Sequence, residues 1–294
     1  MNKAKRLISL GYFPKELPFE FTTAKLADKY EALPKSDPKR RSWPVTFNLS
    51  RSETSRRVIS IPNPEQFVRQ STLIADNWAS IRKVCRASKI SLSSPRFSTS
   101  DAHPVRATNL APTQKLLDKK LESAAPYRFV LETDYARFFS SVYTHAISWA
   151  LHTKEVAKLK QFDSTLLGNS VDLATRNAQG GQTVGIPVGP DVSHIISELI
   201  ASSIDVRAFK SAWPSGYRYV DDYFLCFESE AEAITALENL AQAARYFEIE
   251  LNYEKTKIHK VSELLKGLGY DRLRDFELPE GKRNLSRALV PAAS

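Results

Sequence analysis

The chain has 294 residues, of which 42% are hydrophobic, and its 42 Lys and Arg against 33 Asp and Glu give a formal net charge of +9. The apolar fraction excludes a disordered chain, and the length lies near the roughly 250–300 residues at which one core stops growing, so we expect one body with two or three lobes. Two cysteines exclude a disulfide framework, and five scattered histidines offer no zinc-site spacing. The sequence has no apolar run near the roughly 18 residues of a membrane span and no secretory h-region, so we expect a cytoplasmic protein without a membrane partner.

Basic side chains gather in the N-terminal third of the chain. Residues 77–100 contain five of them and no acid, namely Arg82, Lys83, Arg86, Lys89 and Arg96. A second group spans residues 35–57, with Lys35, Lys39, Arg40, Arg41, Arg51, Arg56 and Arg57. These runs favour a polyanionic partner and are equally compatible with solvated surfaces.

The first 125 residues contain short periodic pieces separated by prolines. Apolar residues at helical spacing predict a helix over residues 67–84, and the Ser-rich run over 88–100 predicts a strand or an extended loop. From residue 128 the pattern changes. Phe129–Leu131 reads as a buried strand leading to Asp134, and a helix is predicted from about Ser141 to Ala150.

A glycine-rich connector over residues 179–190 opens onto another predicted helix, with Asp191 as its N-cap. Residues 217–227 predict a hairpin with Asp221 and Asp222 at its turn. Ser229 and Glu232 form a capping-box pattern before a helix, and residues 248–253 and 257–261 predict strands. This order predicts an α+β, ferredoxin-like sheet with helices on one face.

Acids occur in otherwise apolar surroundings at two places, Asp134 and the pair Asp221-Asp222. Burying a carboxylate costs several kcal/mol unless a cation or hydrogen-bond donors compensate, and three packed together raise one another's pKa. If the two strands are neighbours, the acids predict a metal site, and oxygen ligands without nearby His or Cys favour magnesium or manganese. Taken singly, Asp221-Asp222 can be a polar turn and Asp134 a helix N-cap.

The ordered set of motifs resembles the palm of reverse transcriptases. Asp134–Phe139 resembles motif A, Gly185–Pro190 with Ser193 resembles motif B, Tyr219–Asp222 is a YxDD box like motif C, and Leu251–Thr256 resembles motif D. The resemblance implies reverse-transcriptase-like fingers and palm. We accordingly assign residues 1–125 to an N-terminal extension and fingers, 126–265 to the palm (with 151–182 partly fingers) and 266–294 to a C-terminal segment, with a thumb short or absent.

Four further stretches resemble the bacterial abortive-infection, or defence-associated, reverse transcriptases: Gly11–Thr23, Val58–Phe67, Val142–Lys154 and Ile186–Ile200. This likeness extends from about residue 7 to 279. It implies DNA synthesis in anti-phage defence, with two Mg2+ ions (or Mn2+) as cofactors and nucleic acid and dNTPs as partners. Some members of this group synthesise without a conventional template or prime on a hydroxyl of the protein, and self-association is compatible with it.

The family's functional residues transfer onto matching positions of this chain. Asp134 and Asp221 are then metal ligands with Asp222 as companion acid, the Tyr135 carbonyl is a further ligand, and Phe139 is the steric gate against a ribose 2′-hydroxyl. Lys255 matches the motif D lysine that stabilises departing pyrophosphate, with Lys257 as an alternative. In the motif B loop, nucleotide contacts are expected at Gly185, Pro187 and Gly189.

The chain departs from the family pattern at Val188, where motif B commonly has a glutamine. A hydrogen bond near the sugar or template is then either missing, which counts against ordinary templated copying, or supplied by another group such as Gln182. The basic residues expected to bind the triphosphate or nucleic-acid phosphates are Arg82, Lys83, Arg86, Arg96 and Arg106. The favoured function is RNA-directed DNA polymerisation. A template-independent, protein-primed DNA polymerase and a non-catalytic nucleic-acid-binding scaffold are the alternatives.

Overall fold

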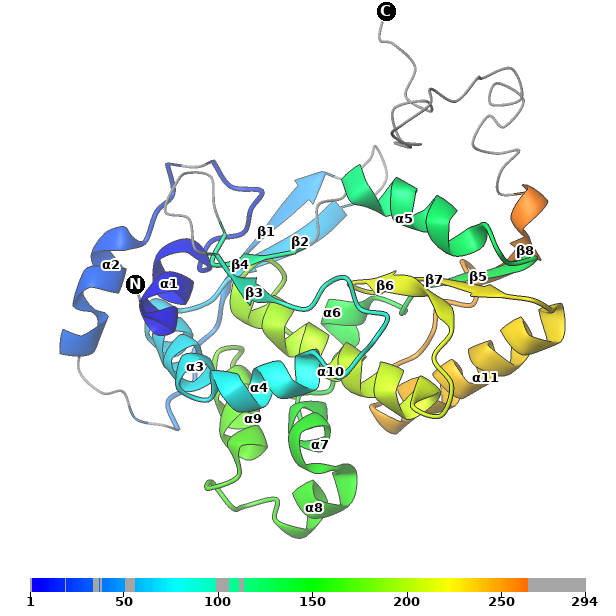
Figure 1. Ribbon diagram of the computed structural model, residues 1–294. Helices are drawn as coiled ribbons and strands as arrows, with labels where there is room; N and C mark the ends of the chain where they lie inside the picture. The colour runs from blue at the N-terminus through cyan, green and yellow to red at the C-terminus, as the bar shows by residue number, and fades with distance from the viewer. Residues whose placement is uncertain are drawn as a thin grey trace, which may run out of the picture.

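The computed structural model describes residues 2–18, 20–33, 37, 39–50, 56–98, 106–110 and 114–263 (Figure 1). The segment that we assigned to residues 266–294 lies outside these ranges. Across the part of the chain that the structure describes, no helix is both long and apolar enough to cross a membrane.

A four-stranded antiparallel sheet forms the centre of the predicted palm. Its strand order is β6 (Ser215–Tyr219), β7 (Asp222–Phe227), β5 (Phe129–Thr133) and β8 (Lys257–Lys260). Helix α10 (Asp191–Phe209) precedes the β6–β7 hairpin, and α11 (Glu230–Tyr246) connects β7 to β8. This β-α-β-β-α-β connectivity is that of a ferredoxin-like sheet, as the sequence predicts.

The two faces of this sheet bury different side chains because residues alternate along each strand. Leu131, Tyr223 and Leu225 belong to the main core together with α10 and α11. On the opposite face, Val130 and Phe224 form a smaller cluster with α5 (Gln114–Ala124). Figure 1 shows α5 on one side of the sheet and α11 on the other. The expectation of helices on one face only was therefore wrong, because α5 covers part of the second face.

The remaining elements lie in the predicted fingers, apart from α6 and most of α7, which fall in the predicted palm. Helices α1 and α9 both pack against α3, and α4 packs against α10. The elements are α1 (Lys3–Leu10), α2 (Ala24–Lys29), the 3-10 helix η1 (Tyr30–Ala32), β1 (Val45–Ser50), β2 (Arg56–Ile61), α3 (Pro64–Asp76), α4 (Trp78–Cys85), β3 (Arg96–Phe97), β4 (Thr108–Asn109), α6 (Phe138–Ser141), α7 (Ala146–His152), α8 (Lys154–Leu159) and α9 (Leu167–Asn177). Strands β1 and β2 pair antiparallel, as do β3 and β4.

Two predicted helices are each divided in two. The helix predicted over residues 67–84 breaks at Asn77, whose side chain donates to the Leu73 carbonyl at 2.9 Å and so ends α3. The helix predicted from Ser141 is interrupted because the Thr144 amide donates to the Thr183 carbonyl and Tyr143 bridges to Val184. A tertiary pairing with the glycine-rich connector thus replaces helical hydrogen bonds there.

The later predictions have mixed outcomes. The hairpin and the Ser229 cap, which accepts from the Glu232 amide, are confirmed. The strand predicted over 248–253 was wrong: Glu248 has a φ of 59°, and only Leu251 forms an isolated bridge, to Tyr135. Pro190 rather than Asp191 is the N-cap of α10.

Candidate active site

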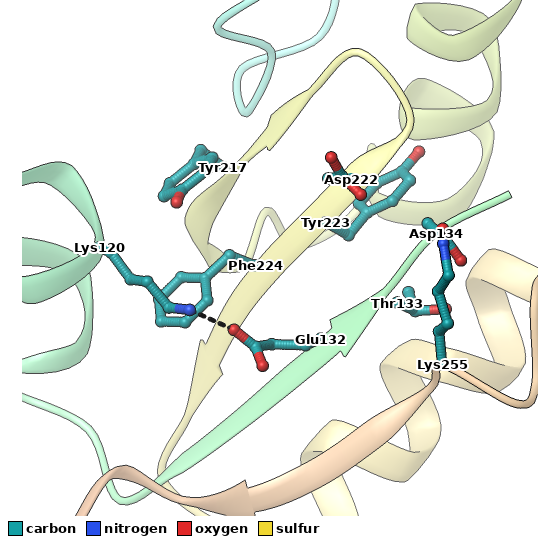
Figure 2. Close-up of a pocket in the computed structure, with 9 residues that line it drawn as sticks. All are labelled: Lys120, Glu132, Thr133, Asp134, Tyr217, Asp222, Tyr223, Phe224 and Lys255. Atoms are coloured by element: carbon teal, nitrogen blue, oxygen red, sulfur yellow. Dashed lines mark hydrogen bonds and ion pairs between the residues drawn. The ribbon is translucent and has the colours of Figure 1, made fainter. Parts of the chain in front are cut away.

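The three acids singled out in the sequence meet where β5 ends and β7 begins. The last paired residues of these strands are Thr133 and Tyr223, so the next residues in the same register are Asp134 and Asp222. Both line a cavity of about 260 Å³ (Figure 2). Asp134 is buried, with 6% of its surface exposed, whereas Asp222 is exposed and Asp221 is half-buried. Residues 87 and 88 positions apart in the chain therefore lie at one site.

The Asp221-Asp222 pair is held by a hairpin whose loop is only Val220 and Asp221. Tyr219 pairs with Asp222 across it. Val220 has a φ of 58°, in the left-handed region that a β-branched residue rarely adopts. Its amide donates to the Ser93 hydroxyl, and its carbonyl accepts from the Arg218 guanidinium at 2.8 Å. Ser93 from outside the hairpin and Arg218 of β6 thus hold this turn.

Lys255 contributes a cation to the same cavity from the turn before β8. Its Nζ lies 2.7 Å from Asp134 Oδ2, and Asp134 raises the pKa of the lysine, aided by Asp222 and Asp221. Figure 2 shows the Lys255 side chain extended toward Asp134. Lys257 instead lies within β8, exposed, and in register with Glu132. Of the two lysines considered from the sequence, Lys255 is the one at the acids.

The carboxylates act on one another electrostatically. Burial and, to a lesser extent, the neighbouring Asp222 and Asp134 together raise the pKa of Asp221 to about 6, against the opposing effect of Lys255. Asp134 Oδ1 is buried and has no hydrogen-bond partner among the described residues. The site therefore holds more negative charge than its own partners neutralise.

This donor set fits a hard divalent cation. The three acids offer carboxylate oxygens, of which Asp134 Oδ1 has no partner among the described residues, and the Lys255 ammonium lies against the other oxygen of Asp134. Within the described ranges no three His, Cys, Asp or Glu side chains are gathered closely enough to hold a metal ion as they stand. The three carboxylates are thus near enough for Asp222 and Asp134 to raise the pKa of Asp221, but they do not all point at one common position.

The Tyr135 backbone, predicted as a further ligand, follows Asp134 directly. The Tyr135–Leu251 bridge uses the Ala136 amide to the Glu250 carbonyl and the Asn252 amide to the Asp134 carbonyl. The Tyr135 carbonyl is not used by this pairing. The Tyr135 ring is buried beneath the site, and its hydroxyl is bonded to that of Tyr223.

The motif B loop lies against the motif A helix. The Gly185 amide donates to the Val142 carbonyl and the Ile186 amide to the Phe139 carbonyl, both at 2.8 Å. Gly185 has a φ of 86°, so a side chain would be strained there. The Gly185 amide is thus engaged within the protein, and the Ile186 amide holds the half-buried Phe139 beside the loop.

The rest of the loop is fixed by Gln179 and Pro14, to which sequence analysis gave no role at the site. Gln179 is buried and donates to the carbonyls of Gln182 and Gly185 at 2.9 and 2.7 Å. Gly189 has a φ of 128°, and a Cβ there would come within 2.5 Å of Pro14. Pro187 is buried, and the Gln182 side chain is exposed.

A sequence model described as "Reverse transcriptase (RNA-dependent DNA polymerase)" matches residues 53–271, well over half of the chain. The chain belongs to the reverse transcriptase family. Its members are nucleotidyltransferases that copy RNA into DNA, and the family generally uses divalent metals. No curated protein matches the chain.

Solved telomerase structures are similar to this reverse transcriptase at low sequence identity. One from Candida albicans, in complex with a fragment of telomeric RNA, is 15% identical with a TM-score of 0.45 and covers 80% of this chain and 45% of its own. Two apo telomerases from Candida tropicalis are 13% and 11% identical, each with a TM-score of 0.48; they cover 80% and 81% of this chain and 54% and 48% of their own. This chain thus spans about half the length of the structures that it matches.

The basic residues predicted to bind phosphates are separated in the reverse transcriptase. Arg82, Lys83 and Arg86 are exposed on or directly after α4, and Arg96 is exposed on β3. Arg106 is engaged within the protein, because its guanidinium pairs with Asp191 and donates to the carbonyls of Phe13 and Gly189. Arg106 therefore anchors the motif B loop.

Sequence reasoning missed two features of the site. On the face of the sheet that carries Asp134 and Asp222, here called the open face, Lys120 of α5 forms an ion pair with Glu132 and lies over the Phe224 ring at 4.8 Å (Figure 2). On the opposite face, which packs against α10 and α11 and is here called the covered face, Arg218 is fully buried between Glu198 and Asp205 of α10, at 2.9 Å from each. The sequence did contain a signal for this buried cluster: Arg218 directly precedes the YxDD box, and Glu198 and Asp205 lie seven residues apart in an otherwise apolar helix.

Proposed function

We propose that this reverse transcriptase is an RNA-directed DNA polymerase that adds dNTPs to a 3′-hydroxyl with two divalent metal ions, and that it acts in anti-phage defence. The observation that carries the proposal is the meeting of Asp134, Asp221 and Asp222 at the ends of paired strands. These acids remain short of positive charge, as the raised pKa of Asp221 and the unpartnered Asp134 oxygen indicate. This is the condition in which a divalent cation gains most from binding.

Asp134 and Asp221 would hold the ions, with Asp222 and the Tyr135 carbonyl beside them. Magnesium or manganese held there would supply a lower pKa for the attacking hydroxyl and positive charge for the triphosphate. Lys255 neutralises Asp134 when the metal is absent and, once released, is placed to donate a proton or positive charge to departing pyrophosphate. Lys255 would thereby have one role without the metal ions and another with them.

Phe139 is the proposed selector of the sugar. The contact of its carbonyl with the Ile186 amide fixes the start of α6 against the motif B loop. A ring held in that position excludes a ribose 2′-hydroxyl by contact, which is worth roughly 10–200-fold for a group of this size. Gln182, with its exposed side chain, is the proposed source of the hydrogen bond that Val188 cannot make.

Exposed basic residues of the fingers, Arg82, Lys83, Arg86 and Arg96, are the proposed contacts to RNA template, DNA product or triphosphate. Contacts of this kind are independent of sequence and weaken as salt rises.

The direct test is incorporation of labelled dNTP on a primed RNA template by a variant carrying Asp221→Ala and Asp222→Ala. We expect incorporation to be abolished while circular dichroism and the melting profile show a folded protein. A variant carrying Glu230→Ala and Glu238→Ala on exposed positions of α11 removes the same charge away from the site and should keep wild-type activity. Unchanged incorporation by the motif C variant would refute the proposal.

The same assay separates the alternatives. DNA made without RNA and extracted by phenol until protease is added would favour a template-independent, protein-primed polymerase. Nucleic-acid binding that persists in EDTA, without turnover of any nucleotide, would favour a scaffold.

The defence role rests on the resemblance to abortive-infection reverse transcriptases. Its test is survival of bacteria expressing the wild type or the motif C variant after phage challenge. Protection by the wild type alone is expected, and equal protection by both would separate defence from polymerisation.

A further inference from the structure

We propose that Arg218 is a positioning residue that aims the YxDD hairpin by fixing Val220 in its left-handed conformation; this rests on the proposed function of the hairpin acids. Arg218 immediately precedes the box and has no exposed surface. Its side chain points to the face of the sheet away from the cavity, so it contacts neither substrate nor metal. Its influence on chemistry must act through the hairpin.

The Arg218 guanidinium donates hydrogen bonds both to two acids of α10, here called the anchor, and to the backbone of the turn. Nε donates to Asp205 and Nη2 to Glu198, both acids of α10. Nη1 donates both to Glu198 at 2.9 Å and to the Val220 carbonyl at 2.8 Å. A rigid, planar group thus ties the motif B helix directly to the backbone of the motif C turn.

The turn requires such a contact. Val220 is one of four described residues other than glycine that have a positive φ. Its amide and its carbonyl each have a buried partner, Ser93 and Arg218. A valine at a φ of 58° persists only where its surroundings impose it. The Ser93 hydroxyl at its amide and Arg218 at its carbonyl impose it here, and Asp221 and Asp222 follow directly.

The anchor also reaches the motif A strand. Asp205 accepts from the Tyr223 hydroxyl, which is bonded to the Tyr135 hydroxyl. Tyr135 is the residue after Asp134. One buried network therefore joins the segments carrying all three acids, and it fixes the Asp221 backbone relative to Asp134.

The test is a double-mutant cycle between Arg218→Lys and Val220→Gly. Lysine keeps the buried charge but cannot span Glu198, Asp205 and the Val220 carbonyl, so we expect kcat to fall about 100-fold with little change in the KM for dNTP. Glycine adopts a positive φ without strain, so Val220→Gly alone should cost only about threefold. In the double variant we expect Val220→Gly to restore kcat at least about tenfold, although the melting temperature stays as low as in Arg218→Lys.

Arg176→Lys is the matched control, because Arg176 makes an ion pair with the buried Asp172 in the fingers, away from the hairpin. It should lower the melting temperature without lowering kcat. If Arg218→Lys does not fold, Ser93→Ala replaces it, since it removes the partner of the Val220 amide and should be suppressed by Val220→Gly in the same way.

Mn2+ binding followed by electron paramagnetic resonance gives a second readout that does not need polymerase activity. Weaker Mn2+ binding in Arg218→Lys, restored by Val220→Gly, is expected even if the reaction is not dNTP polymerisation. Losses that multiply in the double variant, in kcat and in Mn2+ affinity, would overturn the positioning role and leave the proposed function intact.

Discussion

Two groups of carboxylates lie on opposite sides of one hairpin and differ in how far they are neutralised. On the covered face, Glu198 and Asp205 share Arg218 and also accept from the hydroxyls of Ser91, Ser88 and Tyr223 among others. On the open face, Lys255 forms an ion pair with Asp134 and its pKa is also raised by Asp221 and Asp222, although its side chain is largely exposed.

Burial raises the pKa of Asp205 despite its ion pair with Arg218, so the pKa values alone do not separate the two groups. Burial opposes ionisation of Glu198, yet Arg218 and the hydroxyl donors hold its pKa below the usual value. Burial and the neighbouring acids raise the pKa of Asp221 to about 6. What separates them is hydrogen bonding: all four carboxylate oxygens of Glu198 and Asp205 have partners, whereas Asp134 Oδ1 has none among the described residues. Four predictions test this contrast.

Asp221→Asn should produce the largest effect and move activity and stability in opposite directions. Loss of a metal ligand should lower incorporation about 10³-fold or more, roughly 4 kcal/mol of transition-state stabilisation. The metal-free variant should nevertheless melt a few degrees higher near neutral pH, because a like charge has been removed.

The pH dependence of that gain has a definite sign. Asp221 titrates near 3.8 when unfolded and about 6 when folded, so the folded chain binds more protons between these values. The free energy of unfolding of the wild type should fall relative to Asp221→Asn as pH rises from about 4 to 6, and level off above that range. A variant less stable than the wild type at pH 7.5 would contradict the contrast.

Arg218→Met should destabilise the fold by about 3–5 kcal/mol, because it leaves Glu198 and Asp205 buried without their cation. Denaturant unfolding measures this. Replacing all three residues by apolar side chains of similar volume should recover much of the stability, although not the activity. A loss below about 1 kcal/mol for Arg218→Met would show that the covered cluster is not held by the arginine.

Magnesium should stabilise the wild type against heat, by about 2.7 kcal/mol when present at 100 times its Kd. EDTA should reverse the effect, and Asp134→Asn should abolish it. The affinity should strengthen as pH rises through about 6, because a protonated Asp221 cannot bind the ion. Glu238→Gln, on the exposed side of α11, is the control that should respond as the wild type does.

Lys255→Ala should have the smallest effect, lowering kcat about tenfold, or roughly 1.4 kcal/mol. It should also tighten Mn2+ binding, since the ammonium no longer competes for Asp134. Lys257→Ala should change neither quantity. Equal losses for the two lysines would remove the assignment of Lys255 to the site.

Local patterns determined much of this protein from its sequence. The alternation around Asp221-Asp222 gave the hairpin, the Ser229 and Glu232 pattern gave the cap of α11, and the order of elements gave the ferredoxin-like sheet. These features depend on residues a few positions apart, whose preferences act within one turn or strand.

Only the tertiary structure decided the rest. Asn77 and the pairing of residues 143–144 with the glycine-rich connector divided two helices, and α5 occupied the second face of the sheet. The choice of Lys255 over Lys257, the engagement of Arg106 with Asp191, and the burial of Arg218 between Glu198 and Asp205 likewise depend on which distant segment faces each side chain. A charged residue carries the same letter whether solvent, an ion pair or other carboxylates surround it, and those surroundings form only when the chain folds.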